Sequence, residues 1–448
     1  MMQRRCVVGI VLACMLGLVS VGQAQVGSGP GAGGGIGGGV GQIPGTAFGG
    51  ATDPGAGPLA EGFRLIPSIL VGQRYDSNVL FMAKGRSTPG LSKEDWVTTA
   101  IPQVRGLYTG SLATVEAQAS AVGEYYAKNT GLSYVGTRVG GLLDVSRLVS
   151  RVWEGTRLRL SNTYSYTPQP PAFLTGDLSG EGANPFVRGF QVGRVNTQTN
   201  VFNVNLTAPL TQVLNVTGAY TNGFIKFGAS QAQQPGQLLD THYQTYTTGL
   251  ALDLSRQDTV SVNFVGADYS YGTRGTFTTH GGTVGWIRRF TPNVTLNSTA
   301  GALVVEPSLT TGASSASTVA PVGNVALLWN GRTTALTAAY NIGVTPSYQF
   351  QSATLRTQVV TLTLVQQTVI PELIGVVGVN YGRGDQIGAG TTGFSYTAWG
   401  GTGGLNYRLT PETYLGATYS YSHNNQSFGG QEFLIERHMV QLSLAQAF

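Results

Sequence analysis

Ionised side chains recur at every second position in several segments of the first half of the chain. Arg157 and Arg159, for example, alternate with Leu158 and Leu160. Successive side chains of a β-strand point to opposite faces, so such positions share one polar face. The set assigned to this face is Arg105, Glu116, Gln118, Glu124, Arg138, Asp144, Arg157 and Arg159. A wall with both signs of charge can screen solutes through a transverse field, or its members can pair and stiffen the wall; both readings stay open.

Nothing in the chain predicts nucleophilic, metal or cofactor chemistry. The histidines are His242, His280, His423 and His438. None stands with a serine and an acid at the spacing of a catalytic motif. Both cysteines, Cys6 and Cys14, fall in an apolar amino-terminal run that we expect to be removed. We therefore predict no catalytic residue, no metal site, no cofactor and no enzyme.

The charged positions lie in a long series of predicted β-strands. Polar and apolar residues alternate in segment after segment from Gly62 onward. The expected strands are 62–73, 96–108, 112–126, 132–146, 156–167, 194–208, 213–227, 241–254, 258–271, 275–289, 293–306, 316–330, 333–346, 350–366, 371–383, 391–409, 412–424 and 434–448. Every second connection is tight, whereas the others include the long segments 74–95, 168–193, 228–240 and 425–433. The pattern predicts an all-β fold, a single transmembrane antiparallel up-and-down barrel of about 18 strands (about 16 is the alternative), with short periplasmic turns and longer external loops.

Composition agrees with a membrane barrel and excludes other classes. Only 10% of residues are charged, yet the mean hydropathy is +0.04. Strands with one face toward lipid and one toward water combine these two properties. No window shows sustained apolar spacing at three and four residues, and no apolar stretch of about 18 residues follows the amino-terminal run. The net charge is +5, and it is +3 once Arg4 and Arg5 are removed with the amino-terminal run. Such a small positive charge predicts no nucleic-acid partner.

Three regions are expected along the chain. Residues 1–24 have the positive start, apolar run and small residues of a signal peptide, with cleavage after Ala24. Residues 25–61 are glycine-rich and almost uncharged, which predicts a disordered periplasmic tail. Residues 62–448 are expected to form the barrel. These regions predict export to the outer membrane.

Aromatic residues gather near the ends of the expected strands. At the external ends they are Tyr125, Tyr126, Tyr164, Tyr166, Phe224, Phe227, Tyr269, Tyr271, Tyr419 and Tyr421. At the periplasmic ends they are Trp286, Phe290, Trp329, Tyr407 and Tyr414. Amphipathic rings prefer membrane interfaces, so we expect two aromatic girdles.

The final residues resemble the closing strand of bacterial outer-membrane β-barrels. Val440, Leu442 and Leu444 alternate with polar or small residues, and the chain ends on the aromatic Phe448. Alternation places all four on one face. The resemblance implies that this strand is read by the barrel-assembly machinery.

A second resemblance lies at the end of the first strand. Arg74, Tyr75, Asp76, Asn78 and Phe81 stand in the segment Arg-Tyr-Asp-Ser-Asn-Val-Leu-Phe. Asp and Asn side chains can cap their own backbone there, and Phe81 can anchor the turn, so a plain turn motif is one reading. The segment also resembles a box of the form Asp-x-Asn-aliphatic-x-Phe in a porin-like family encoded with exopolysaccharide and capsule biosynthesis genes. That resemblance implies association with secreted polysaccharide or with polysaccharide-export proteins.

Together these features predict a porin-like channel for passive passage of hydrophilic solutes. The expected partners are outer-membrane lipid, lipopolysaccharide and the assembly machinery. The alternative is a barrel that sheathes or scaffolds a partner, in polysaccharide secretion or as a conduit around a multihaem protein. We expect Arg105, Arg138, Arg157 and Arg159 to make the lumen modestly anion-favouring, since they outnumber the acids of the same set.

Overall fold

The computed structural model describes residues 62–87, 89–169, 195–230, 240–272, 275–309, 317–346, 354–387, 394–428 and 431–448. The expected signal peptide and glycine-rich tail lie outside the described residues, as does most of the segment 168–193.

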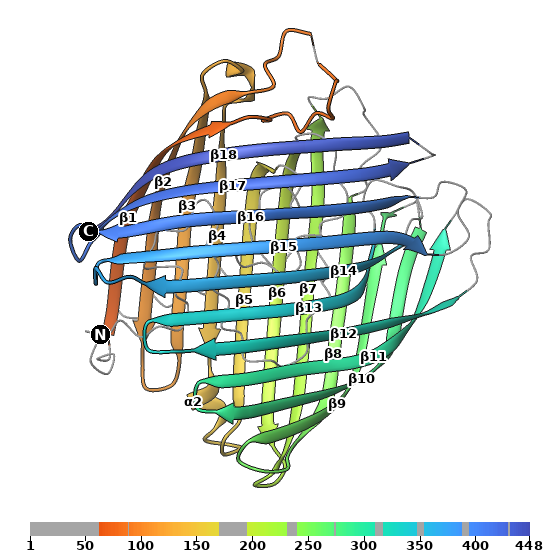
Figure 1. The fold of residues 1–448 in the computed structure, drawn as a ribbon. Helices are drawn as coiled ribbons and strands as arrows, with labels where there is room; N and C mark the ends of the chain where they lie inside the picture. The colour runs from red at the N-terminus through yellow and green to blue at the C-terminus, as the bar shows by residue number, and fades with distance from the viewer. Residues whose placement is uncertain are drawn as a thin grey trace.

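Eighteen strands make one sheet. They are β1 (Gly62–Asp76), β2 (Asp95–Thr109), β3 (Thr114–Tyr126), β4 (Tyr134–Asp144), β5 (Arg157–Gln169), β6 (Val195–Pro209), β7 (Leu214–Ser230), β8 (Thr241–Asp253), β9 (Asp258–Ser270), β10 (Gly275–Thr291), β11 (Val294–Leu309), β12 (Thr318–Asn330), β13 (Thr334–Pro346), β14 (Thr354–Gln367), β15 (Leu373–Ile387), β16 (Ser395–Arg408), β17 (Thr413–Phe428) and β18 (Gln431–Ala447). Each pairs antiparallel with its neighbours in sequence, and β1 also pairs with β18, so the sheet closes (Figure 1). The predicted fold class, an 18-strand antiparallel barrel, is confirmed.

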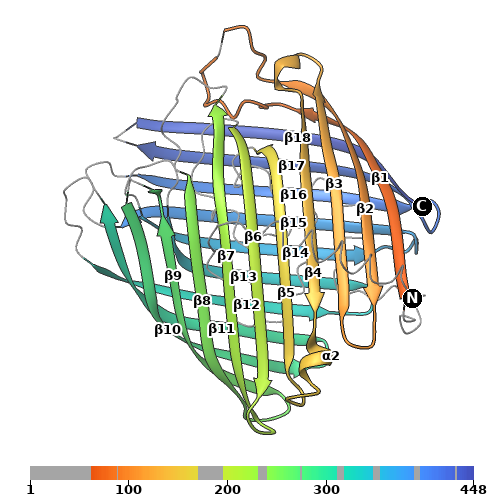
Figure 2. The same ribbon diagram turned by 180° about the vertical axis from the view of Figure 1, so that it is seen from behind.

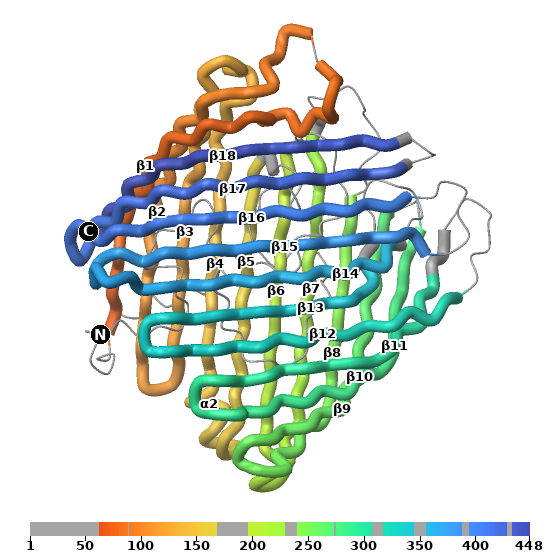
Figure 3. The backbone as a smooth tube through the Cα atoms, viewed as in Figure 1, coloured from red at the N-terminus to blue at the C-terminus, as the bar shows by residue number. Residues whose placement is uncertain are grey.

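The strands are steeply tilted. In Figures 1 and 2 the strands β10–β18 of one wall cross the strands β1–β9 of the opposite wall. Such tilt is the geometric condition for closing a sheet into a barrel. Figure 3 follows the chain round the barrel until β18 lies beside β1. Among the described residues no helix has the length and apolarity needed to cross a membrane.

The connections at the two ends of the barrel differ in length only in part as expected. Turns such as 210–213, 254–257 and 292–293 are tight at one end of the barrel. The connection 145–156 at that same end is longer and holds the short helix α2 (Ser146–Val149). At the other end, 77–94 is long and 127–133 contains the turn η1 (Thr130–Leu132).

The expected long loop 425–433 is wrong. Strand β17 continues to Phe428 and β18 begins at Gln431, with Gln426 opposite Phe433. The run Asn424-Asn425-Gln426-Ser427 has the polarity of a loop, but every residue of it pairs in the ladder. Backbone hydrogen bonding therefore extends beyond the apolar part of the hairpin.

The aromatic girdles are also corrected. Tyr125 is 57% exposed on the outer face, but its neighbour Tyr126 is 4% exposed in a buried cluster with Val97. Tyr269 and Tyr271 are likewise buried, in a cluster with Phe277. Adjacent residues of a strand cannot share a face, so an aromatic pair in sequence supplies one ring to each side.

Candidate functional site: the inner wall of the barrel

Burial and pairing define which side chains face the interior. On β3 the exposed Tyr125 faces out and the buried Tyr126 faces in, so the even positions of this strand are inner positions. Residues directly opposite each other in a ladder share a face. Arg138 of β4 lies opposite Ser120 of β3, and Asp144 lies opposite Arg159 of β5. The same steps extend the assignment round the barrel.

Charged inner residues gather on one arc, which we call the charged wall: the inner face of β18 and β1–β5. Its members are Arg64, Arg74, Asp76, Asp95, Arg105, Glu116, Glu124, Arg138, Asp144, Arg157, Arg159 and Arg437. Within the described strands β6–β17, inner positions carry charge only at Asp253, Arg289 and Arg408, close to strand ends. We call that arc the uncharged wall.

Two of the arginines expected from the sequence form ion pairs on this wall. Arg105 Nε donates to Glu116 Oε1 at 2.7 Å, between β2 and β3. Arg159 Nε donates to Asp144 Oδ2 at 2.8 Å, between β4 and β5. Each pair neutralises itself across one strand interface. Gln118 stands opposite Arg105 and beside Gly140, within the same ladder.

The other two arginines are different. Among the described residues neither Arg138 nor Arg157 makes an ion pair, and the buried Nε of Arg138 has no hydrogen-bond partner there. Arg138 lies between Ser120 and Ser165, and Arg157 lies opposite Thr207. Of the four arginines expected from the sequence, only Arg138 and Arg157 therefore keep a positive charge that no acid in the described part of the chain neutralises.

A third group of charges joins the two ends of the chain. Arg437 of β18 donates from Nε to Asp76 Oδ1 at 2.9 Å and from Nη2 to Asp76 Oδ2, a two-pronged contact. Arg74 Nη1 donates to Glu124 Oε1 at 3.2 Å, and Tyr126 donates to the other oxygen of Glu124. Arg437 is 4% exposed and Asp76 is fully buried. Buried charges of this kind need such pairing to offset the loss of water.

The family-like box forms the end of β1 and the start of the next connection. Its first three residues extend the strand, which the sequence analysis had ended at position 73. The Asn78 amide donates to Asp76 Oδ1 at 3.1 Å, and Asn78 Oδ1 accepts from the Met82 amide at 2.9 Å. This is the backbone capping expected of these residue types.

Phe81 anchors the same segment. Its ring lies 4.5 Å from the Arg437 guanidinium carbon and is 2% exposed. Its φ of 53° is in the left-handed region, which a bulky residue adopts only when packing compensates. The ring belongs to a buried cluster with Ile435 of β18 and with Phe394, which precedes β16. The segment is thus held against the inner face of β18.

Tyr75 points the other way, to the outer face. Its hydroxyl donates to Glu94 Oε2 at 2.7 Å, and Lys128 Nζ donates to Glu94 Oε1 at 2.7 Å. These hydrogen bonds, that from Lys128 first, hold the pKa of Glu94 below its ordinary value. They tie the connection 77–94 to the one that follows β3.

Sequence reasoning missed Arg437, the partner of the box. The two residues of its ion pair stand 361 positions apart. A signal existed, since the first and last strands of a closed barrel must pair. Alternation in β18 would then have placed Arg437 on the inner face near the end of β1.

The expected assembly residues lie on the outer face of β18. Val440, Leu442, Leu444 and Phe448 are all exposed there. The Phe448 amide donates to Pro67 O at 2.9 Å, which ties the last residue to β1.

The uncharged wall combines neutral polar side chains and glycines with buried apolar clusters such as that of Tyr243, Tyr269 and Phe277. Asn324 of β12 donates to Asn341 of β13 at 2.5 Å, and at the border with the charged wall Thr199 of β6 shares a hydrogen bond of 2.6 Å with Ser165 of β5. Its glycines let neighbouring strands approach closely; a Cβ at Gly301 would lie 2.1 Å from Gly282 O. No group of three or more metal-ligating side chains occurs in the part of the chain that the structure describes.

Comparisons with known proteins give a likeness of architecture. No family model and no curated protein matches the chain. OpdK, an outer membrane protein of Pseudomonas aeruginosa, aligns at 13% identity over 86% of this chain and 99% of its own, with a TM-score of 0.45. OccAB3 of Acinetobacter baumannii aligns at 12% over 86% and 99%, with a TM-score of 0.44. An anion-selective porin from Comamonas acidovorans aligns at 13% over the same shares, with a TM-score of 0.38.

The strand pairing itself defines the class, a closed, up-and-down antiparallel β-barrel. Likeness at this level of identity and TM-score assigns neither a family nor a solute.

Proposed function

We propose that the chain is an outer-membrane channel for the passive passage of hydrophilic solutes. The observation that carries the proposal is the division of the barrel into two faces. Large apolar side chains such as Val262, Val284 and Leu442 are exposed on the outside, while the inner face carries most of the charged and many of the neutral polar side chains beside buried apolar clusters. A sheet that closes with this polarity can lie in lipid and enclose water. Barrels of about 18 strands are wide enough for an aqueous channel.

The unpaired arginines support an anion preference. The pairs Arg105–Glu116 and Arg159–Asp144 contribute dipoles, whereas Arg138 and Arg157 contribute whole charges. Fixed charge on a pore wall concentrates the opposite ion. The proposal therefore gives the selectivity of the channel to Arg138 and Arg157 more than to Arg159.

A restricted lumen favours a second candidate, a barrel that serves as a scaffold for a partner protein without free pore activity. Inner side chains in the half toward the long connections, such as Thr241, Tyr269 and Asn424, are almost completely buried. Inner positions nearer the tight turns, such as Thr283 and Thr402, are half-buried. Association with polysaccharide export is the finer form of either candidate, and its support is the likeness of the Asp76–Phe81 box.

Single-channel recording in a planar bilayer tests the proposal. The purified barrel is expected to insert and to give discrete current steps in potassium chloride, with heat-modifiable migration on gels as the control for folding. A folded barrel that inserts without passing current would overturn the channel and favour the scaffold. Recovery of the protein from the soluble periplasmic fraction would overturn both.

A further inference from the structure

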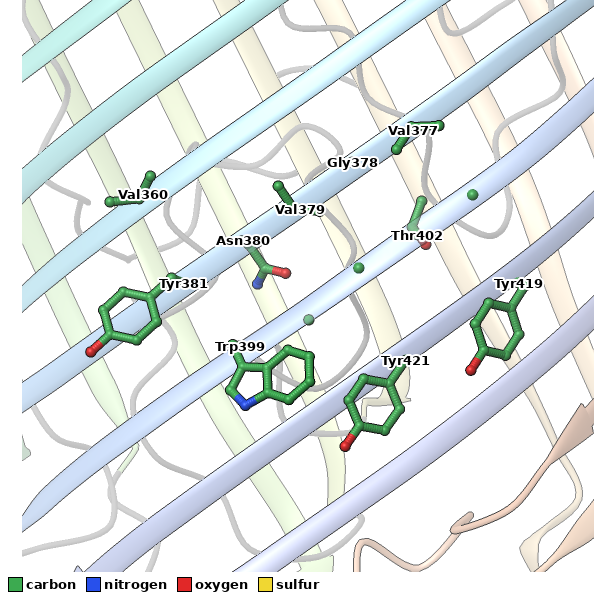
Figure 4. A pocket seen from close by; sticks show the side chains of 13 residues that line it. Val360, Val377, Gly378, Val379, Asn380, Tyr381, Trp399, Thr402, Tyr419 and Tyr421 are labelled. Atoms are coloured by element: carbon green, nitrogen blue, oxygen red, sulfur yellow. The ribbon is translucent and has the colours of Figure 1, made fainter.

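A narrow groove opens on the outer face of β14–β17, on the opposite side of the sheet from the inner side chains. Its floor is Gly401 and Gly403 of β16. Ladder neighbours make the sides: Val379 and Tyr421 flank Gly401, and Val377 and Tyr419 flank Gly403. Trp399 closes one end, and the volume of this open groove is about 510 Å³. Figure 4 shows the valines and the tyrosines on either side of the bare strand.

The backbone does not require glycine on this floor. A Cβ at Gly403 would meet no heavy atom within 4 Å, and one at Gly401 would lie 3.6 Å from Gly378 O, an ordinary contact. Neither residue has a φ in the left-handed region. The groove therefore exists because side chains are absent, not because strands must approach closely.

The shape of the groove fits an extended hydrocarbon chain. Trp399 and Leu405, the nearest large outer residues of β16, are six positions apart, which is about 20 Å of strand. Between them the floor is bare and the sides are aliphatic or aromatic. The surrounding lipid is as apolar as the groove, so the hydrophobic effect does not favour one lipid chain in the groove over another. A preference for one lipid must come from close packing and from polar contacts at the end of the groove.

Such polar contacts stand beyond the Trp399 end. Arg383 follows Tyr381 by two positions on the outer face of β15. It shares the carboxylate of Asp385 with Arg356 of β14: Arg383 Nε lies 3.1 Å and Arg356 Nη2 4.0 Å from Asp385 Oδ2. Both arginine side chains are exposed, 57% and 40%. Two guanidinium groups on one carboxylate leave a net positive charge, and their planar donors match phosphate oxygens.

We propose that this groove binds a phosphorylated glycolipid, with one acyl chain along Gly401 and Gly403 and a phosphate at Arg383 and Arg356. Glycolipid is chosen over phospholipid because the cationic end faces the long connections. That side is external in the proposed function, and the external leaflet of an outer membrane is built from phosphorylated glycolipid. The inference rests on outer-membrane placement but not on conduction through the lumen.

Native mass spectrometry of the intact barrel tests the site. Wild type in mild detergent is mixed with diphosphorylated lipid A, and the bound fraction is compared with that of Gly403→Leu and Arg383→Ser. Gly403→Leu fills the groove and Arg383→Ser removes the phosphate contact; each is expected to weaken binding about fivefold to tenfold, up to 1.4 kcal/mol.

Two matched controls lie on other parts of the outer face. Gly218→Leu places the same side chain at an outer glycine of β7, where the nearest atom to a Cβ, that of Leu206, is 3.9 Å away. Arg288→Ser removes an arginine of the opposite end, which is paired with Asp258. Both controls should bind like wild type, and heat-modifiable migration reports that every variant folds.

Three results would overturn the proposal. The first is equal binding by Gly403→Leu and wild type. The second is equal binding of lipid A and its dephosphorylated form, which would leave an apolar groove without phosphate recognition. The third is a wild-type oligomer that Gly403→Leu dissociates, which would make a second copy of the chain the occupant. Channel currents that persist while binding is lost would separate this site from the proposed function.

Discussion

The charged wall and the uncharged wall enclose the same interior by different means. Across the charged wall, neighbouring strands are linked by ion pairs such as Arg437–Asp76 and Arg105–Glu116. Across the uncharged wall, strands are linked by neutral hydrogen bonds and by close backbone contact at glycines such as Gly301. The charges gather where the two ends of the chain meet. The uncharged wall is stabilised by its backbone ladder, its packing and neutral side-chain hydrogen bonds, without ion pairs between its described inner side chains. A barrel can therefore concentrate its inner charges on one arc.

The sharpest test of this difference is the loss of Arg437. Arg437→Ala removes the two-pronged partner of the buried Asp76 and leaves only Arg74, whose Nε lies 3.8 Å from Asp76 Oδ2. The free energy of unfolding should therefore fall by about 3 kcal/mol. The measurement is denaturant unfolding in detergent followed by tryptophan fluorescence. Asn341→Ala on the uncharged wall removes a neutral hydrogen bond and should cost about 1 kcal/mol. Similar losses from the two variants would show that the two walls are not stabilised differently.

The close approach of strands on the uncharged wall gives a second test. A Cβ at Gly301 would overlap Gly282 O, so Gly301→Ala should lower the free energy of unfolding by about 1–3 kcal/mol. Gly403→Ala is the control, because a Cβ there meets no neighbour. The measurement is the unfolding midpoint of each variant in the same detergent. Equal midpoints for Gly301→Ala and Gly403→Ala would contradict this account.

Selectivity tests the charged wall as an electrostatic surface. Arg157→Ser removes an unpaired cation and should shift the reversal potential in a salt gradient toward cations. The anion-to-cation permeability ratio should change about fourfold, since a unit charge about 10 Å away through water favours an anion and disfavours a cation by about 0.4 kcal/mol each. The double variant Arg159→Ser/Asp144→Ser removes a neutral pair and should leave the ratio unchanged. A shift from the double variant equal to that from Arg157→Ser would show that pairing does not decide selectivity.

The smallest effect is expected outside the barrel interior. Glu94 accepts hydrogen bonds from Lys128 and Tyr75, and its pKa is below the ordinary value. A lowered pKa stabilises the folded protein above the ordinary pKa of the group, and this contribution is lost as pH falls through the lowered value. Glu94→Gln should therefore reduce slightly the dependence of the unfolding midpoint on pH in the acidic range. An unchanged acid profile would mean that these exposed contacts contribute nothing measurable.

Much of this architecture was predictable because a strand has a period of two. Alternation alone located eighteen strands and placed Arg157 and Asp144 on one face. It could not distinguish the paired Arg159 from the unpaired Arg157, because pairing depends on the stagger between neighbouring strands. Arg437 was missed for the same reason, as its partner is set by how the barrel closes. The hairpin around Gln426 was misread because polarity marks contact with water and not the end of a ladder.

The seam between the first and last strands has a kinetic consequence. Strand β1 pairs with β18 only from Ser68 to Asp76, so residues 431–438 of β18 have no strand on that side. The following connection replaces it: the Ser77 amide donates to His438 O, Asn78 Nδ2 to Glu436 O and the Lys84 amide to Leu434 O. Amide exchange with deuterium should therefore be fastest here among the strands, and these few bonds should be the last to form when the barrel assembles.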